Sequence, residues 1–403
     1  MTSTAHRVGV YLAVVQFFFV STWTLYVLYL PQLAAQAGVP AKAIPWILML
    51  DQVVFAFSDL GVGVMADRMV RVVGKLGAFI LGVTLLSCLA FLLLPFAAPH
   101  ASAALFFALT LVWTVTSSAL RAPPLVLLGK YAARPAVPWL TALLLFGLGA
   151  AGAIAPYLGV ALRNTDPRLP FVLSSVALAA ATLGILGAER TRGRAAPPVA
   201  TSGAPAGGKP AGIAAGFLVA VALLAGGYQV HVSLNSAPLY LRYAAPGDLP
   251  YLLPVFMVGF NLLMLPASLA TRRYGGLAVM GVGGLIAALA ALLAQHAGSL
   301  GVLITLQFIA GGAWGTVLMS AMTAALAVGH TGREGKVTGG LFALLALAAF
   351  ARIAIAAAGF NKDPTFAALL SWAPTAVWAG AGLLLLLMLP VERRLYAATP
   401  STD

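Results

Sequence analysis

The sequence predicts an all-helical membrane protein that crosses the bilayer twelve times, in two sets of six helices. Three observations indicate this. Of the 403 residues, 61% are hydrophobic and 8% are charged, against about half and about a quarter in a soluble domain. Twelve apolar stretches are each long enough to cross a hydrocarbon core about 30 Å thick as a helix. One long polar segment separates the first six stretches from the last six.

The apolar stretches are joined by short connections that are rich in turn-forming Gly, Pro, Asn and Asp. The predicted spans are 8–34, 43–66, 74–97, 101–128, 137–162 and 169–188 in the first half, and 212–241, 249–270, 276–296, 299–328, 337–360 and 365–390 in the second. Helices are expected because lipid offers backbone groups no hydrogen-bond partner. We therefore expect an N-terminal bundle over 1–188, a Pro/Gly/Ala-rich linker over 189–211, and a C-terminal bundle with a short tail over 212–403.

The distribution of positive charge predicts the orientation of the chain. Two of the 23 Lys and Arg residues, Arg121 and Arg352, lie inside predicted spans and well away from the span ends. Sixteen others share the side of the N-terminus, and only five lie on the opposite side, at Lys42, Arg163, Arg168, Arg242 and Lys362. Cytoplasmic loops carry an excess of Lys and Arg. Both termini, the linker and the tail are therefore expected in the cytoplasm.

Several classes of function are excluded by the sequence. The net charge of +13 lies in loops, without a basic run interleaved with aromatics, so no nucleic-acid partner is expected. No Walker-type phosphate loop, metal-ligand spacing or hydrolase motif is present. We expect no cofactor, no bound metal and no enzymatic activity. An intramembrane enzyme or lipid-handling protein is the alternative class, and it would need a catalytic cluster near one membrane interface.

The connection between the second and third spans contains a sequence signature. It reads Gly63-Val-Met-Ala-Asp67-Arg68-Met-Val-Arg71. With the six-plus-six layout and the basic linker, it resembles the major facilitator superfamily of secondary transporters, whose signature is Gly, three residues, Asp-Arg, one residue, Gly, then bases. Val70 stands where the family prefers Gly. Glycine allows close helix packing, and the acid can cap a neighbouring helix or pair with a base, which would latch the two halves together on the cytoplasmic side.

The resemblance implies two six-helix bundles that rock around one central site. The fifth predicted span contains Gly147, Gly149, Gly152 and Pro156, a pattern similar to that of proton-driven exporters in the superfamily. We expect a secondary active transporter that exports a small organic molecule in exchange for protons. The alternative is uptake of an organic anion or other metabolite, by proton symport or facilitated diffusion. In that case Arg121 and Arg352 would contact the anion, since guanidinium binds carboxylate or phosphate as a fork.

Four charged residues inside the spans are candidates for coupling and gating. Asp51 and Arg352 lie at similar depths in spans two and eleven, which are neighbours in the family, so their pairing can form a gate that breaks during rocking. Asp59 and Arg121 lie at similar depths near the cytoplasmic ends of spans two and four and can pair within the first half. Fixed structural ion pairs are the alternative reading. Asp51, Asp59 and His231 are the proton-coupling candidates, because an aspartate that loses its partner can take up a proton and histidine titrates near neutrality.

Uncharged polar residues predict a cavity. Tyr228, His231 and Asn235 share one face of span seven at spacings of three and four, and the family places spans one, four, seven and ten around the central site. The candidates for substrate binding are Gln16, Trp23, Tyr26, Arg121, Tyr228, Gln229, Asn235, Asn261, Gln307, Trp314 and Arg352.

The expected partners are the lipid bilayer, protons and a small-molecule substrate, and the chain is expected to be a monomer. Its Ala/Gly-rich composition and lack of an N-x-S/T site favour a bacterial inner membrane.

Overall fold

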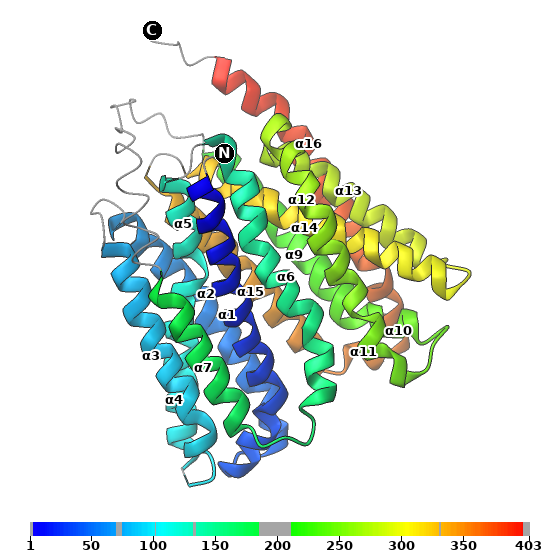
Figure 1. Ribbon diagram of the computed structural model, residues 1–403. Coiled ribbons are helices and arrows are strands. Elements are labelled where there is room, and N and C mark those ends of the chain that lie inside the picture. Colours follow the sequence, from blue (N-terminus) through cyan, green and yellow to red (C-terminus); the bar gives the residue numbers. More distant parts are fainter. Residues whose placement is uncertain are drawn as a thin grey trace.

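A computed structural model describes residues 3–69, 75–100, 102–131, 134–184, 211–329 and 332–397. The predicted linker lies outside these residues, apart from Ala211. The described chain is helical, without a strand, and it runs back and forth between two ends of the molecule (Figure 1). The start of α1 and the end of α16 lie at the same end, which we call the termini end; the opposite end is the far end.

The first six passes form the first set of helices. Their elements are α1 (Ser3–Gln36), η1 (Ala41–Ala43), α2 (Ile44–Met69), α3 (Lys75–Ala97), α4 (Ala103–Ser117), η2 (Ser118–Leu120), α5 (Ala122–Tyr131), η3 (Arg134–Ala136), α6 (Val137–Ala161) and α7 (Arg168–Leu183).

The last six passes form the second set. Their elements are α9 (Ala211–Val230), η4 (His231–Asn235), α10 (Ser236–Tyr240), η5 (Pro246–Asp248), α11 (Leu249–Leu252), α12 (Pro254–Tyr274), α13 (Gly276–Gln295), α14 (Leu300–Val328), α15 (Glu334–Ala357), η6 (Phe360–Lys362) and α16 (Pro364–Ala397).

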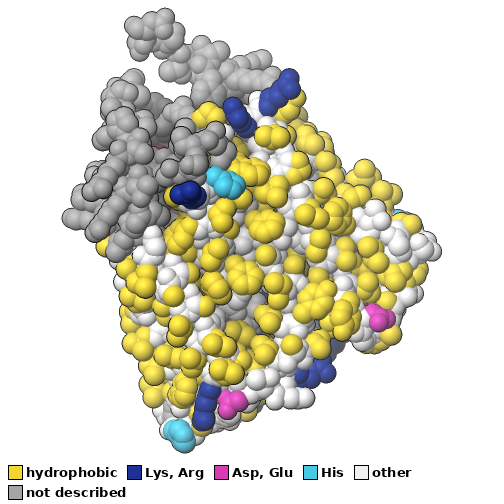
Figure 2. All heavy atoms as spheres, viewed as in Figure 1, with side chains coloured by type: hydrophobic (Ala, Val, Ile, Leu, Met, Phe, Trp, Pro, Cys, Tyr) yellow, Lys and Arg dark blue, Asp and Glu magenta, His cyan; other side chains and the backbone are white. Residues whose placement is uncertain are grey.

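These helices match a membrane protein in length and in surface. Within the described residues, eleven passes are long and apolar enough to span a bilayer, and α7 is a shorter apolar helix. Figure 2 shows hydrophobic side chains over most of the visible face, with charged side chains gathered near its two ends. The prediction of an all-helical, multi-pass membrane protein is confirmed.

The two sets are joined mainly along two edges, where α2 packs on α15 and α6 packs on α12. At the termini end one apolar cluster draws on both sets, with Leu12, Leu125 and Leu140 from the first and Met322 and Leu341 from the second. This cluster continues through the second set as far as Phe256, but its first-set members lie in the half of the molecule toward the termini end. Two other clusters at the far end each belong to one set.

One far-end cluster contains Leu30 and Phe171 of the first set, and the other contains Tyr240 and Leu303 of the second. Contact across the sets persists there along the α6 edge, where Tyr157 meets the ring of Tyr251 at 5.7 Å. The two sets therefore share a core at the termini end and diverge toward the far end (Figure 1).

The fourth pass is broken at Ser118–Arg121, which the prediction of one continuous span missed. Pro123 and Pro124 lack an N–H, so the carbonyls four residues earlier, at Ala119 and Leu120, have no helical donor. Gln16 of α1 replaces one of these donors, since its Nε2 donates to the Leu120 carbonyl at 2.6 Å. A side chain of another helix thus satisfies a backbone group that lipid could not.

The seventh pass also departs from a regular helix, because His231–Asn235 form a π-helical turn between α9 and α10. The Ser236 backbone N–H and side-chain hydroxyl both donate to the His231 carbonyl, the hydroxyl at 2.9 Å. Such turns often occur at functional sites. Here the turn rotates the positions of His231 and Asn235 away from the regular spacing assumed in the sequence.

Candidate functional site

A carboxylate at the end of α2 caps the first turn of α15. Asp67 accepts hydrogen bonds from the backbone N–H groups of Gly335, at 2.6 Å, and Lys336, at 2.9 Å. A carboxylate is favourable there because a helix N-terminus carries unpaired donors and partial positive charge. The contact joins the first set to the second at the termini end, as the signature predicted. Arg68 is exposed beside it, and Arg71 lies outside the described residues.

Glycines bring the two backbones together at the same point. A Cβ on Gly63 would lie 2.2 Å from the Gly335 carbonyl oxygen, and one on Gly335 would lie 2.1 Å from the Gly63 oxygen. A Cβ on Gly339, one turn further along α15, would lie 2.5 Å from the Asp59 carbonyl oxygen. The α2–α15 contact therefore depends on the absence of side chains at these three positions.

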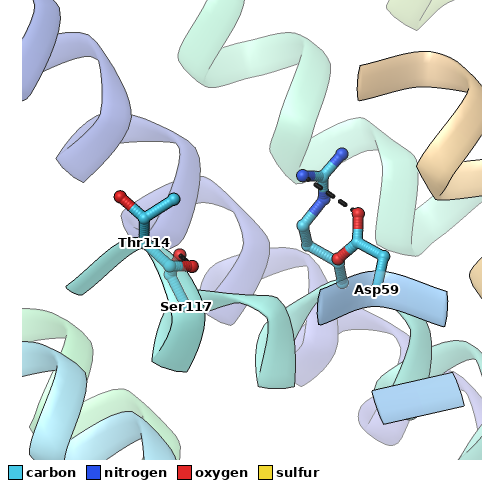
Figure 3. Close-up of polar contacts among 4 residues, drawn as sticks. Asp59, Thr114 and Ser117 are labelled. Carbon is cyan, nitrogen blue, oxygen red and sulfur yellow. Dashed lines mark hydrogen bonds and ion pairs between the residues drawn. The ribbon is translucent and has the colours of Figure 1, made fainter. Parts of the chain in front are cut away.

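Asp59 and Arg121 form the predicted ion pair, with 3.1 Å between a carboxylate oxygen and a guanidinium nitrogen. Figure 3 shows Asp59 joined to its guanidinium partner by the dashed line. The Asp59 side chain is 0% exposed and that of Arg121 is 16% exposed. Neither carboxylate oxygen accepts a well-aligned hydrogen bond, although the Ser118 hydroxyl lies near enough to contribute. The carboxylate therefore depends on the charge of Arg121 for compensation.

The ion pair lies where the two sets meet. The Arg121 guanidinium carbon is 4.7 Å from the centre of the Phe55 ring of α2 and 5.4 Å from that of Phe342 on α15. A cation over an aromatic face is attracted by the ring. Rings from both sets thus enclose the guanidinium, so the surroundings of this ion pair depend on how the sets are arranged.

The predicted Asp51–Arg352 ion pair is not formed. Asp51, 3% exposed, accepts hydrogen bonds from the Tyr26 hydroxyl at 2.8 Å and the Thr114 hydroxyl at 3.0 Å. Both donors belong to the first set and are uncharged, so the carboxylate is turned into its own bundle. Arg352 lies on α15 of the second set, partly buried and within electrostatic range of Tyr228 on α9.

Aromatic rings pack around Tyr26, one of the two hydroxyl donors to Asp51. Trp113 stacks with Trp23, with 5.8 Å between centroids, and lies 4.5 Å from the ring of Tyr26. Trp23 also meets the edge of Phe55 at 5.4 Å. Trp113 and Tyr26 are buried, whereas Trp23 is partly exposed. Of the aromatic candidates in the first set, Trp23 is the one that retains access from outside the bundle.

The candidates of the second set form their own cluster. His231 and Gln307 are buried and share a hydrogen bond of 2.9 Å between Nε2 and Oε1. The His231 ring lies 5.3 Å from that of Trp378. Tyr228 is stacked on Trp314, with centroids 4.4 Å apart and ring planes at 7°.

The remaining amide candidates have different surroundings. Asn235 donates to the Leu370 carbonyl at 2.9 Å, which ties the π-helical turn to α16. Gln229 is partly buried at the end of α9. Asn261 of α12 reaches into α6 of the first set. In the amide orientation that satisfies both of its groups, its nitrogen donates to the Phe146 carbonyl at 3.2 Å and its oxygen accepts from the Ala150 N–H at 3.0 Å. Asn261 thus connects the two sets, as Asp67 does at the termini end.

The structure brings the predicted residues together within each set, and few of them meet across the sets. Sequence reasoning missed Thr114 and Phe342 as partners of the charged groups, and it did not specify which helix Asp67 would cap. Thr110 and Thr114 share one face of the fourth pass with a buried aspartate opposite, which is the signal that would have found Thr114. Within the described residues, no group of three or more His, Cys, Asp or Glu side chains could hold a metal ion.

Comparisons with known proteins identify the fold. No family model and no curated protein sequence matches the chain. Among solved structures, the human organic anion transporter MFSD10 (TETRAN) is similar over 96% of this chain and 100% of its own, at a TM-score of 0.73 and 15% identity. A bacterial homologue of the iron transporter ferroportin, in an outward-facing state, is similar over 95% of this chain and 99% of its own, at a TM-score of 0.71 and 13% identity.

A third similar structure is the major facilitator superfamily transporter FucP in an outward conformation, with 94% and 98% of the two chains covered, a TM-score of 0.68 and 13% identity. The chain therefore has the major facilitator fold, as the signature and the layout of spans predicted.

Proposed function

We propose that this protein is a secondary active transporter that moves a small organic molecule across the membrane by alternating access, in exchange for protons and in the direction of export. The observation that carries the proposal is the asymmetry between the two ends. The two sets share a core and a carboxylate cap at the termini end, and keep separate cores at the far end. Similar structures are those of transporters. A bacterial inner membrane and a monomer complete the proposal.

The charge bias supports placing the termini end in the cytoplasm. In that orientation the arrangement corresponds to an outward-facing state. Two of the similar structures carry an outward-facing state in their descriptions, which agrees with this assignment. Transport then requires the termini end to open. The contacts of Asp67 with Gly335 and Lys336, and the α2–α15 glycine contacts, would have to break.

Among the three proton-coupling candidates, we favour Asp59. Its partner Arg121 lies against the Phe342 ring of the other set, and the Asp59 backbone lies against Gly339 of the same helix, α15. Opening of the termini end would move Phe342 and Gly339 away from the ion pair and admit water to it. The carboxylate could then exchange a proton with that water. The hydrogen-bond partners of Asp51 and of His231 all belong to their own sets. Rocking of rigid bundles would leave those contacts unchanged.

The test begins with a thermal-shift screen of the purified protein against a library of anions, neutral compounds and cations, which supplies a ligand. Flux of that ligand is then measured in proteoliposomes under imposed pH gradients of either sign. An exporter driven by proton exchange should accumulate the ligand against its concentration on the acidic side of the membrane. Flux that ignores both gradient signs would rule out proton coupling.

Variants assign the carrier. Asp59→Asn should lose gradient-driven accumulation and keep ligand counterflow, which needs no net proton movement. Asp51→Asn is the matched control, because it neutralises a buried carboxylate of the same helix that has no cationic partner. Uphill transport retained in Asp59→Asn and lost in Asp51→Asn would transfer the role to Asp51.

A second candidate is uptake of an organic anion by proton symport or facilitated diffusion. The observation in its favour is that Arg121 and Arg352 are the interior charged groups with partial exposure. One similar structure is described as an organic anion transporter. The same proteoliposome assay separates the two candidates, because symport accumulates ligand on the side opposite to the one expected for exchange.

A further inference from the structure

We propose that the transported compound is an organic anion, and that Arg352 and Tyr228 hold its carboxylate or other oxyanion group, with the body of the compound against the ring of Tyr228, which is stacked on Trp314. This inference rests on the proposed function and names its substrate class. It follows from the distribution of exposed charge, the lack of a counter-ion at Arg352 and the surroundings of that residue.

The accessible charge inside the described spans is positive. Asp51 and Asp59 are 3% and 0% exposed. Asp51 is held by two hydroxyl donors, and Asp59 by its ion pair. Arg121 keeps 16% exposure, and Arg352 is also partly exposed. A compound that enters between the sets would therefore meet guanidinium groups before it meets a carboxylate. Interior charges act strongly on such a compound because the surrounding dielectric is low.

Arg352 has no anionic partner within the described chain. The ion pair found there belongs to Asp59 and Arg121. The Arg352 Nε is buried and lacks a hydrogen-bond acceptor. A buried, uncompensated cation is costly, whereas a carboxylate that binds the guanidinium fork would supply both charge and acceptors. The terminal nitrogens of the partly exposed guanidinium are the groups available for that contact.

Tyr228 extends the site beyond a single charge. It lies on α9, which packs against α15, the helix of Arg352, and its hydroxyl offers a second donor to an oxyanion. Its ring stacks on Trp314 at 4.4 Å and lies 5.9 Å from Phe256. Trp314 and Phe256 are buried, so they support the partly exposed ring of Tyr228, which is the aromatic surface offered to a ligand. An aromatic surface beside a few polar groups is typical of sites for small organic ligands. The anion is thus expected to carry an apolar, preferably planar, body.

An organic cation fits this arrangement poorly. It would need an accessible carboxylate, and neither aspartate offers one without the loss of its present partners. Displacement of Arg121 from Asp59 would leave a second uncompensated guanidinium between Phe55 and Phe342. A neutral substrate would leave the charge of Arg352 without a counter-ion both before and after it binds.

The test uses charge-matched compounds on two scaffolds: 2-naphthoate, 2-naphthamide and 2-naphthylmethylammonium, and hexanoate, hexanamide and hexylammonium. Binding to the purified full-length protein is measured by calorimetry. The carboxylates should bind about tenfold to a hundredfold more tightly than the amides, the range expected for hydrogen bonds to charged groups. The naphthoate should bind more tightly than hexanoate because of the aromatic surface.

Variants locate the site. Arg352→Gln should abolish the preference for carboxylate over amide. Arg352→Lys keeps the charge without the fork and should retain part of the preference, which separates the charge effect from a loss of folding. Tyr228→Phe should weaken carboxylate binding several-fold. Arg163→Gln is the matched control, since Arg163 lines a separate polar cavity of about 470 Å³ at the far end, beside Arg168 and Gln36.

The inference is wrong if the ammonium members bind best, if neither scaffold prefers the carboxylate, or if the preference survives in Arg352→Gln. Loss of the preference in Arg163→Gln would place the anion in the far-end cavity and also overturn it. The proposed function fails separately. Carboxylates bound through Arg352 but never moved across proteoliposomes would contradict transport and leave the site assignment intact.

Discussion

Replacement of Asp67 by alanine should open the termini end. The side chain accepts two hydrogen bonds, from Gly335 and Lys336, which no other described contact replaces at the start of α15. Loss of a capping side chain costs about 1–2 kcal/mol, and charged acceptors lie at the upper end. We take about 2 kcal/mol, which changes the equilibrium constant between the closed and the open termini end by about 30-fold. If the open arrangement is populated at about 1% in the native protein, the variant raises it to about one quarter.

The assay is a distance distribution between spin labels at the termini end. Cys88, the one cysteine of the chain, is replaced by alanine, and cysteines are introduced at Leu183 of α7 and Ala327 of α14, both exposed. A second, longer distance should grow in Asp67→Ala. The matched control is Asp248→Ala, because Asp248 accepts from the Ala245 N–H at 3.0 Å and thus caps a helix within its own set. An unchanged distribution in Asp67→Ala, or an equal change in the control, would refute the reasoning.

Two further variants follow from close contacts. Gly63→Ala should also populate the longer distance, because its Cβ would lie 2.2 Å from the Gly335 carbonyl oxygen and outweigh the gain of about 1 kcal/mol in helix propensity; the same spin-label pair measures it. Gln16→Leu should destabilise the fold by about 1–3 kcal/mol, because the Leu120 carbonyl loses its donor inside the membrane. Its effect is read from the shift of the unfolding midpoint in detergent.

Each variant has a control on the same helix or carbonyl. Gly61 of α2 faces open space, so Gly61→Ala should leave the distances unchanged; a similar change there would contradict the contact argument for Gly63. Pro124→Ala returns an N–H at the position that serves the Leu120 carbonyl in a regular helix. Added to Gln16→Leu, it should recover part of the lost stability. No recovery would mean that the Gln16 amide acts in another way.

The fold could be predicted because lipid reduces the choices open to the chain. Backbone groups must be paired within a helix, and bilayer thickness sets the length. The predicted ends lie within a few residues of most observed ones. Two local departures also had sequence signals that were not used. The Pro123-Pro124 pair marks the break in the fourth pass, and Pro238, which lacks an N–H, follows the π-helical turn.

The charged pairs show where sequence reasoning stops. Depth along a span can be counted from its ends, but the direction of a side chain around the helix depends on neighbours. Asp59 and Arg121 share both depth and direction, and they pair. Asp51 and Arg352 lie at similar depths in the membrane, but their side chains do not point toward each other. The hydroxyls of Tyr26 and Thr114 turn Asp51 into the first set, and no spacing rule within α2 contains that information.

Contacts across the sets and contacts within a set should have separable effects. Asp67 and Gly63 act between α2 and α15, so their replacement changes the energy of one arrangement relative to the other and leaves each bundle folded. Gln16 acts within the first set, between α1 and the broken fourth pass, so its loss weakens the bundle in both arrangements. Spin-label distances should therefore respond to the first pair and the unfolding midpoint to Gln16. A variant that altered both equally would mean that the bundles do not move as rigid bodies, and the assignment of Asp59 as the carboxylate whose surroundings change would lose its basis.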